Sequence, residues 1–132
     1  MTTYATRGAV ALTPEFNTDG GFEDPALDFD HLQRFTMGNR DLECEVLNLF
    51  RTQSKLLVNK LHQAGDDRAW LEAAHTLKGS AAGIGAWRVQ DAAALVEKLS
   101  GAARLQQGPA LLAALEAALG EADQFIAAFL ND

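Results

Sequence analysis

Four segments of this chain repeat apolar residues at steps of three and four, and glycine or proline separates each segment from the next. This spacing is typical of helices that bury one face. The breaks leave long segments over 41–64, 67–84, 87–103 and 109–131, preceded by a short one over 28–36. Four apolar faces joined by short connections bury one another most economically side by side. We therefore predict an all-α fold, an antiparallel up-down four-helix bundle with a short extra N-terminal helix.

Composition supports helices over strands. The 132 residues include 24 Ala and 19 Leu against seven Val and Ile together, and no proline occurs between Pro25 and Pro109. Ala and Leu are strong helix formers, whereas β-branched residues favour strands. A chain of this length is expected to form one domain. Residues 1–26 lack periodicity and are predicted to be a flexible N-terminal arm, which leaves 27–132 as the bundle.

The helical spacing also predicts which positions are buried. Asp67 is a plausible cap for the helix over 67–84, and Pro109 suits the first turn of the last helix. The predicted core positions, helix by helix, are Leu42, Val46, Leu49, Phe50, Leu57 and Leu61; Trp70, Ala74, Leu77, Ala81 and Ile84; Val89, Ala92, Ala93, Val96 and Leu99; and Leu112, Leu115, Leu119, Ala122, Ile126 and Phe129. The glycines at 83 and 85 are interpreted as a turn.

Charge and hydropathy exclude several classes of function. The formal net charge is −7 and the basic residues do not cluster, which argues against nucleic-acid binding through phosphate contacts. The most apolar stretch, residues 111–119, is interrupted by Glu116 and is too short to span a membrane. Cys44 is the single cysteine and the first residues do not form a secretory signal, so we expect a cytoplasmic protein without disulfides. We also expect a monomer.

His75 lies on the face of its predicted helix opposite to the core positions, so it is not expected to contribute to core packing. On a wheel of about 100° per residue with Leu77 at zero, the core positions of this helix fall within about 60°, whereas His75 falls at about 160°. The imidazole is therefore expected to face solvent. An exposed histidine usually has no special role, so its neighbours decide the interpretation.

The neighbours of His75 one turn away are unusual. They include Leu71, Glu72, Lys78 and Gly79, and Ala82 follows two turns on. Gly79 in a helix interior costs about 1 kcal/mol relative to alanine, so a compensating role is expected. A glycine there leaves the ring uncovered, and Lys78 adds a compact positive charge. An open imidazole with a nearby ammonium suits a phosphoryl acceptor.

The sequence around this histidine, AHTLKGSAAGIGA over 74–86, resembles the histidine-containing phosphotransfer domain of multistep two-component phosphorelays. That family has the pattern His-x-x-Lys-Gly-Ser/Ala on the exposed face of the second long helix of a four-helix bundle. His75, Lys78, Gly79 and Ser80 meet every position of the pattern, and the resemblance extends over about residues 27–131.

The resemblance implies that His75 accepts a phosphoryl group on Nε2 from a receiver-domain aspartate and passes it to another receiver. Lys78 would balance phosphoryl charge and Gly79 would keep the ring accessible. Ser80 matches the motif, although a buried hydroxyl bonded to a backbone carbonyl is an equally good interpretation. Family members often place a polar residue of the next helix near the phosphoryl group. Gln90 is a candidate, whereas Glu97 would be electrostatically unfavourable there.

The implied partners are response-regulator receiver domains and a hybrid histidine kinase. No cofactor of its own is expected, because the receiver would supply the Mg²⁺. Docking is predicted on the face that carries Leu71, Glu72, Ser80 and Ala82, together with exposed positions of the preceding helix. An ATP site is not expected, because residues 78–80 invert the Gly-Lys-Ser order of a P-loop and no strand precedes them.

Two other classes of function stay open. A non-catalytic helical adaptor would bind a partner helix through an apolar face, without chemistry. A metal-binding bundle would draw ligands from its histidines, Cys44 and carboxylates, but His31, His62, His75 and Cys44 lack the i,i+3 or i,i+4 spacing of helical metal sites. No metal site is therefore predicted. His62 is interpreted as complementing a helix dipole, and His31 as a surface or packing residue.

Overall fold

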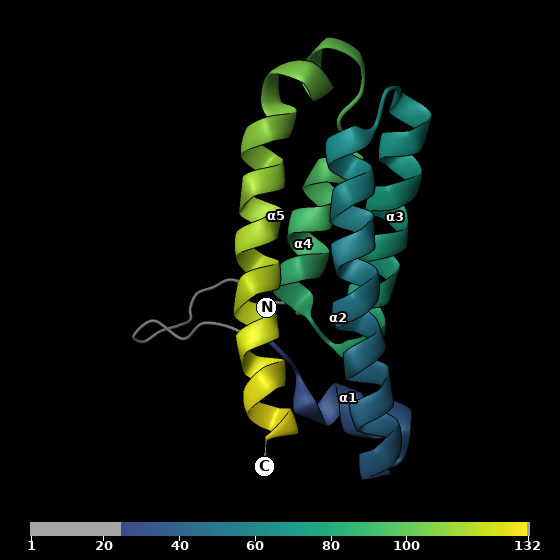
Figure 1. Cartoon of the computed structure of the whole chain (residues 1–132), viewed down its shortest axis with the longest axis vertical. Helices are drawn as coiled ribbons and strands as arrows, with labels where there is room; N and C mark the ends of the chain where they lie inside the picture. Colours follow the sequence, from purple (N-terminus) through teal and green to yellow (C-terminus); the bar gives the residue numbers. More distant parts are fainter. Residues whose placement is uncertain (1–24, 132) are drawn as a thin grey trace.

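The computed structural model describes residues 25–131, and this part of the chain forms a bundle of four long helices with a short fifth across one end (Figure 1). The helices are α1 (Phe29–Thr36), α2 (Arg40–Gln63), α3 (Asp67–Ile84), α4 (Trp87–Glu97) and α5 (Gly101–Leu130). Connections of two to three residues between the long helices make neighbours antiparallel. The predicted fold is confirmed. The predicted arm over 1–26 lies, except for Pro25 and Ala26, outside the described residues.

Acidic side chains cap α1 and α3, and Asp67 acts differently from the prediction. Asp66, not Asp67, caps α3, because its carboxylate accepts a hydrogen bond from the Ala69 N–H at 2.8 Å. The Asp67 carboxylate accepts hydrogen bonds from the Gly101 N–H at 3.0 Å and from the Arg104 guanidinium at 2.7 Å. These contacts lower the pKa of the Asp67 carboxyl, the Arg104 bond contributing most. Asp67 therefore joins the start of α3 to the start of α5.

The last helix begins earlier than predicted. The sequence favours a start at Pro109, yet α5 runs from Gly101 and contains that proline. Proline lacks an N–H and normally ends or kinks a helix. Tertiary contacts support the turns before it: Asp67 binds the helix start, and Gly108 packs so closely on the Trp70 ring that a Cβ there would lie 3.2 Å from it. Figure 1 shows these first turns tilted across the end of the bundle.

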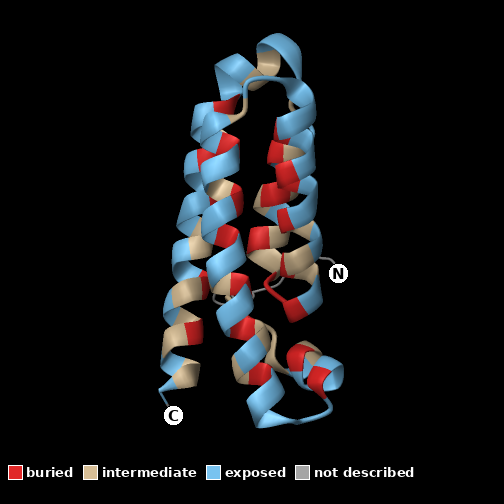
Figure 2. Cartoon of the chain, turned by 45° about the vertical axis from the view of Figure 1, so that its right-hand side comes forward, coloured by how far each residue is buried: buried red, intermediate tan, exposed pale blue. Residues whose placement is uncertain are grey.

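Buried residues line the inner sides of the helices (Figure 2). The predicted core of α3 is confirmed, since all five of its positions are buried. The prediction for α2 is wrong at two positions: Leu42 is exposed and the Leu49 side chain is 57% exposed. Leu47 and Ser54 are buried instead. The reason is that leucines occur on two faces of α2, and periodicity alone does not say which face meets the neighbouring helices. The positions expected in the core that are only partly buried are Val46, Ala92, Leu99, Leu119 and Phe129.

The α3–α4 turn is held by α1. Gly85 ends α3 with φ +80°, a left-handed conformation that favours glycine, and a Cβ there would lie 2.9 Å from the Asp28 carbonyl oxygen. Gly83, predicted to share this turn, lies inside α3. The Trp87 indole N–H donates to the Asp28 carboxylate at 3.0 Å, and the His31 ring packs edge-on against Trp87. His31 is therefore a packing residue.

The helices are long but not uniformly apolar. α5 has 30 residues and is interrupted by charged side chains such as Glu116. Within residues 25–131, none of the helices combines the length and the apolar character needed to cross a bilayer.

Candidate functional site

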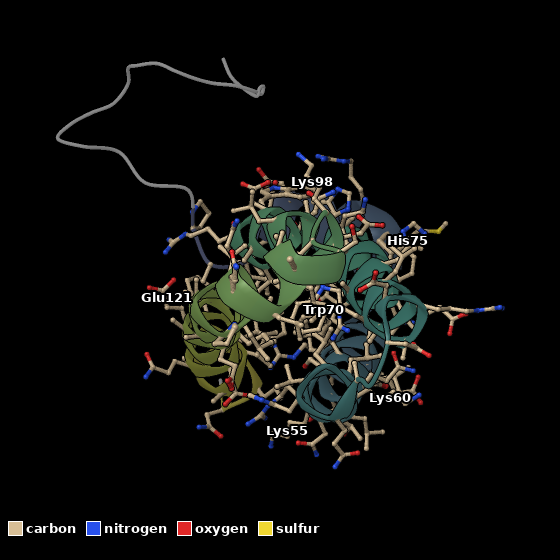
Figure 3. The ribbon with its side chains drawn as sticks, turned by 90° about the horizontal axis from the view of Figure 1, so that it is seen from above. Lys55, Lys60, Trp70, His75, Lys98 and Glu121 are labelled. Carbon is tan, nitrogen blue, oxygen red and sulfur yellow. The ribbon has the colours of Figure 1, made fainter. Side chains whose placement is uncertain are left out.

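The exposed face of α3 carries His75. Its neighbours Ala74 and Leu77 are fully buried, whereas the His75 side chain is 69% exposed, on the side where the helical wheel places it. Figure 3 looks down the bundle and shows His75 at the periphery and Trp70, from the same helix, near the centre. The core positions of α3 therefore hold the histidine outward on a rigid element.

A carboxylate from α4 contacts both predicted functional side chains. Glu97 lies 2.6 Å through Oε2 from the His75 Nδ1 and 2.6 Å through Oε1 from the Lys78 Nζ. The Glu97 side chain is only 16% exposed, so it lies in the seam between α3 and α4. The Lys78 ammonium, and after it the His75 ring, hold the pKa of the Glu97 carboxyl below its ordinary value. The carboxylate is therefore ionised at neutral pH.

This contact decides which nitrogen of His75 is available. An ionised carboxylate only accepts hydrogen bonds, so the Nδ1 that faces it must carry the proton. In a neutral imidazole the lone pair is then on Nε2. In its neutral form, the 69% exposed His75 side chain therefore carries its lone pair on Nε2, and a neutral imidazole is the form of histidine that acts as a nucleophile.

The polar partner on α4 differs from the expected one. Gln90 is the sequence candidate for a polar residue near the phosphoryl group, where Glu97 is expected to be unfavourable, whereas the α4 side chain that contacts the ring is Glu97. Gln90 lies seven residues earlier, about two turns down the same helix. The contact uses Nδ1, the ring nitrogen opposite to the predicted phosphoryl acceptor. Lys78 neutralises Glu97, and the Nδ1 hydrogen bond gives its charge a favourable partner.

The surroundings of the ring are open on the glycine side. A Cβ added at Gly79 would meet nothing within 4 Å, so the glycine leaves empty space one turn beyond His75 rather than filling a packing requirement. Leu71 is 47% exposed, which is a large apolar side chain presented to solvent one turn before the histidine. Ser80 and Ala82 are partly buried. Glu72 is exposed and pairs with Arg68 at 3.1 Å, one turn earlier on α3.

The remaining histidine and the cysteine lie elsewhere. His62, near the end of α2, contacts Glu116 of α5 at 3.2 Å, so its partner is a side chain as well as the helix dipole. Cys44 is partly buried in α2. Among residues 25–131, no group of three or more His, Cys, Asp or Glu side chains is arranged to hold a metal ion. The described residues therefore do not support the metal-binding alternative.

The arrangement of the site matches a known family. The model of the Hpt domain matches residues 45–125, which includes most of α2, all of α3 and α4, and most of α5. This match covers more than half of the chain. The chain belongs to the Hpt domain family. His75, Lys78 and Gly79 all lie within the matched residues, on the helix where the sequence motif places them.

Solved structures of similar shape come from two bacteria. The histidine-containing phosphotransfer protein B (HptB) of Pseudomonas aeruginosa PAO1 aligns with a TM-score of 0.70 and 26% identity, covering 79% of this chain and 93% of that one. The histidine phosphotransferase ShpA of Caulobacter crescentus aligns with a TM-score of 0.61 and 32% identity, covering 80% and 91% respectively. No curated protein sequence matches significantly. This Hpt domain therefore has nearly the full extent of both solved relatives.

Proposed function

We propose that this Hpt domain carries a phosphoryl group on the Nε2 of His75, from a receiver-domain aspartate to a second receiver in a multistep phosphorelay. The main support for this proposal is the hydrogen bond between the His75 Nδ1 and Glu97. It favours the tautomer whose proton is on Nδ1 and whose lone pair is on Nε2. The protein is a phosphohistidine carrier without an ATP site of its own. It works as a cytoplasmic monomer.

The chemistry of the transfer divides between this domain and its partner. The Nε2 lone pair attacks phosphorus, the N–P bond forms, and the acyl-phosphate O–P bond breaks to return a carboxylate to the receiver. The receiver's acidic side chains hold the Mg²⁺ that offsets charge on the phosphoryl oxygens. The Hpt domain supplies the nucleophile, the nearby Lys78 ammonium and the open approach beside Gly79. The return transfer is the same step run in reverse.

The docking surface is the exposed face of α3 with the neighbouring part of α2. Leu71 supplies an exposed apolar side chain near the histidine, and Leu49 and Leu56 supply two more on α2. Arg51 of α2 binds Asp123 of α5, so its side of α2 faces α5. Leu49 and Leu56 lie about 160° and 140° around α2 from Arg51. They therefore lie on the exposed face of α2 that points away from α5. Apolar anchors surrounded by polar residues are typical of transient interfaces.

The partners are receiver domains of response regulators and of a hybrid histidine kinase. A receiver that approaches His75 must bring its aspartyl phosphate within about 3 to 3.5 Å of Nε2, so a surface without bulky side chains beside the ring is required. Gly79 provides that clearance, and Glu72 and Ser80 border it on the same helix.

The decisive experiment incubates the protein with a receiver domain that has been phosphorylated in the presence of Mg²⁺. We expect acid-labile, base-stable phosphate on this chain, with a ³¹P chemical shift that reports an Nε2 linkage. A receiver that binds without transferring phosphate would support the helical-adaptor alternative instead. Phosphate on Nδ1 would contradict the assignment of the nucleophile.

A further inference from the structure

The motif lysine is already paired in the unphosphorylated domain. The Lys78 ammonium contacts the Glu97 carboxylate at 2.6 Å, and that carboxylate contacts the Nδ1 edge of His75, opposite to the phosphoryl acceptor. A phosphoryl group on Nε2 brings more negative charge than one carboxylate, together with three acceptor oxygens. Because Glu97 already neutralises Lys78, a second cation near Nε2 would find charge left to balance.

Arg68 is the other cation of α3 and lies on the same side of that helix as His75. Seven residues separate them, which is about 20° around the helix and about 10.5 Å along it. The Arg68 Nε donates to the Glu72 carboxylate at 3.1 Å, so the side chain runs toward the C-terminal end of α3 and thus toward His75. Glu72 precedes His75 by three residues, at a neighbouring surface position. The guanidinium is therefore held about one turn from the ring.

The pair between Arg68 and Glu72 is weak and uses little of the guanidinium. The two side chains are 86% and 65% exposed, and water screens an ion pair of this kind. Within residues 25–131, Glu72 is the only partner of this guanidinium, and it engages Nε alone. Arginine has five N–H donors, so both terminal amino groups stay available. Such a fork suits bidentate contact with phosphoryl oxygens.

We propose that Arg68 exchanges Glu72 for the phosphoryl group when His75 is phosphorylated, and holds the phosphoryl oxygens while the domain carries the group. The greater charge of the phosphoryl group attracts the guanidinium more strongly than a single carboxylate does, and it repels the neighbouring carboxylate of Glu72. Arg68 therefore stabilises the phosphorylated state of the carrier. The inference deepens the proposed function, on which it rests for the presence of a phosphoryl group on His75.

The first test measures the phosphoryl group itself, in protein phosphorylated by phosphoramidate without any receiver. A cation beside a phosphoryl group favours its dianion and lowers its pKa. Arg68→Ala should therefore raise the pKa of the phosphoryl group, followed by ³¹P NMR, by about half a pH unit, the scale of one exposed ion pair. Glu72→Gln should lower this pKa, because it removes both a competing acceptor and a repelling charge.

Two further variants show whether the contact is direct. Arg68→Ala in the Glu72→Gln background should still raise the pKa, because that background has no Glu72 carboxylate for the loss of the arginine to expose. Arg88→Ala is the matched control, since Arg88 also pairs with a glutamate, at 2.7 Å, but lies nine residues before Glu97 and about 180° around α4 from it. It should leave the phosphoryl pKa unchanged. An effect of Arg68→Ala that vanishes in the Glu72→Gln background, or that Arg88→Ala equals, would overturn the inference.

The second test measures the equilibrium of phosphoryl exchange between this domain and a receiver. Arg68→Ala should shift the phosphoryl group toward the receiver by about twofold to fivefold, because the phosphorylated carrier loses a stronger contact than the unphosphorylated one. The equilibrium constant separates this effect from docking, since a contact made only in the complex changes both rates equally. An equilibrium that is the same in Arg68→Ala and the wild type would contradict the proposal.

The two donors separate failure of the inference from failure of the proposed function. Labelling of His75 by phosphoramidate with no response to Arg68→Ala would remove the inference and leave His75 as the acceptor. Labelling by phosphoramidate but by no receiver would remove the proposed relay, while the ³¹P titration would still decide whether Arg68 holds the phosphoryl group. No label on His75 from either donor would overturn both.

Discussion

Two exposed histidines of this Hpt domain each contact a glutamate on a neighbouring helix, and only one pair has the features of a reactive site. His75 on α3 meets Glu97 through Nδ1 at 2.6 Å. His62 on α2 meets Glu116 of α5 through Nε2 at 3.2 Å. The contacts use opposite ring nitrogens. At His62 the contact uses Nε2, the nitrogen farther from the backbone, whereas at His75 it uses Nδ1, on a side chain that is 69% exposed.

The carboxylates of the two pairs also differ in their surroundings. Glu97 is 16% exposed and shared with Lys78, whereas Glu116 is 42% exposed. Exposed ion pairs contribute little because water screens them and both side chains lose entropy. A carboxylate beside an exposed histidine therefore does not by itself mark a reactive site. The two pairs differ in which ring nitrogen the carboxylate contacts and in whether a lysine also binds that carboxylate.

The largest effect is expected from replacing His75, with His62 as the comparison. His75→Gln should abolish acid-labile phosphorylation by a phosphorylated receiver, because the nucleophile is gone, while stability should change by no more than about 0.5 kcal/mol for an exposed position. His62→Gln should be phosphorylated at the wild-type rate. Radiolabel transfer and circular dichroism measure the two properties. Wild-type incorporation in His75→Gln would refute the assignment of the acceptor.

The next effect concerns the space beside His75. Gly79→Gln should nearly stop transfer from a receiver, because a long side chain occupies the approach to the ring, yet it should slow a small donor such as acetyl phosphate much less. Gly79→Ala should stabilise the fold by up to about 1 kcal/mol, since the added Cβ meets nothing within 4 Å.

Gly120 offers the control for this access argument, because it also lies in a helix with nothing within 4 Å of an added Cβ, on α5. Gly120→Gln should gain helix propensity and transfer normally. Equal slowing of the protein donor and the small donor in Gly79→Gln would show that the glycine acts on the local geometry of His75 rather than on access.

A smaller effect is expected at the docking surface. Leu71→Ser should weaken receiver binding by about fivefold to tenfold, the loss of about 1 kcal/mol typical of a moderate interface contact. Leu95→Ser is the matched control, because Leu95 is equally exposed at 51% but projects about 200° around α4 from Glu97. Titrations monitored by NMR give both affinities. Equal weakening by the two variants would move the docking surface away from α3.

The smallest effect is on stability and its dependence on pH. The pKa of the Glu97 carboxyl is lowered in the folded state, so its contribution to stability is present above the ordinary glutamate pKa and is lost as the pH falls through the folded value. Glu97→Gln should therefore lower the free energy of unfolding at pH 7 by up to about 1 kcal/mol, and the difference should shrink in acid. Glu116→Gln should lower the free energy of unfolding by a smaller amount. Urea denaturation at both pH values measures these differences; a deficit that persists in acid would point to packing instead of charge.

The sequence predicted the parts of this site that lie on one helix. Helical geometry alone relates His75, Lys78 and Gly79, because residues three and four apart share a face. The same geometry separated His75 from the core positions of α3, all of which are buried. Contacts between helices are what the sequence does not predict: Glu97 rather than the candidate Gln90 contacts His75, Asp67 binds the start of α5 instead of capping α3, and Leu49 is exposed instead of lying in the core.

The sequence by itself determined the number of long helices, the exposed face of α3 and the identity of the side chains one turn from His75, because these follow from a period of 3.6 residues. Only the tertiary structure decided that α5 begins at Gly101 and passes through Pro109, because the supporting contacts come from Asp67 and Trp70 on another helix. It likewise decided the partner of the histidine. Side chains 22 residues apart meet only when α3 and α4 pack antiparallel, and that packing places Glu97 between Lys78 and the ring.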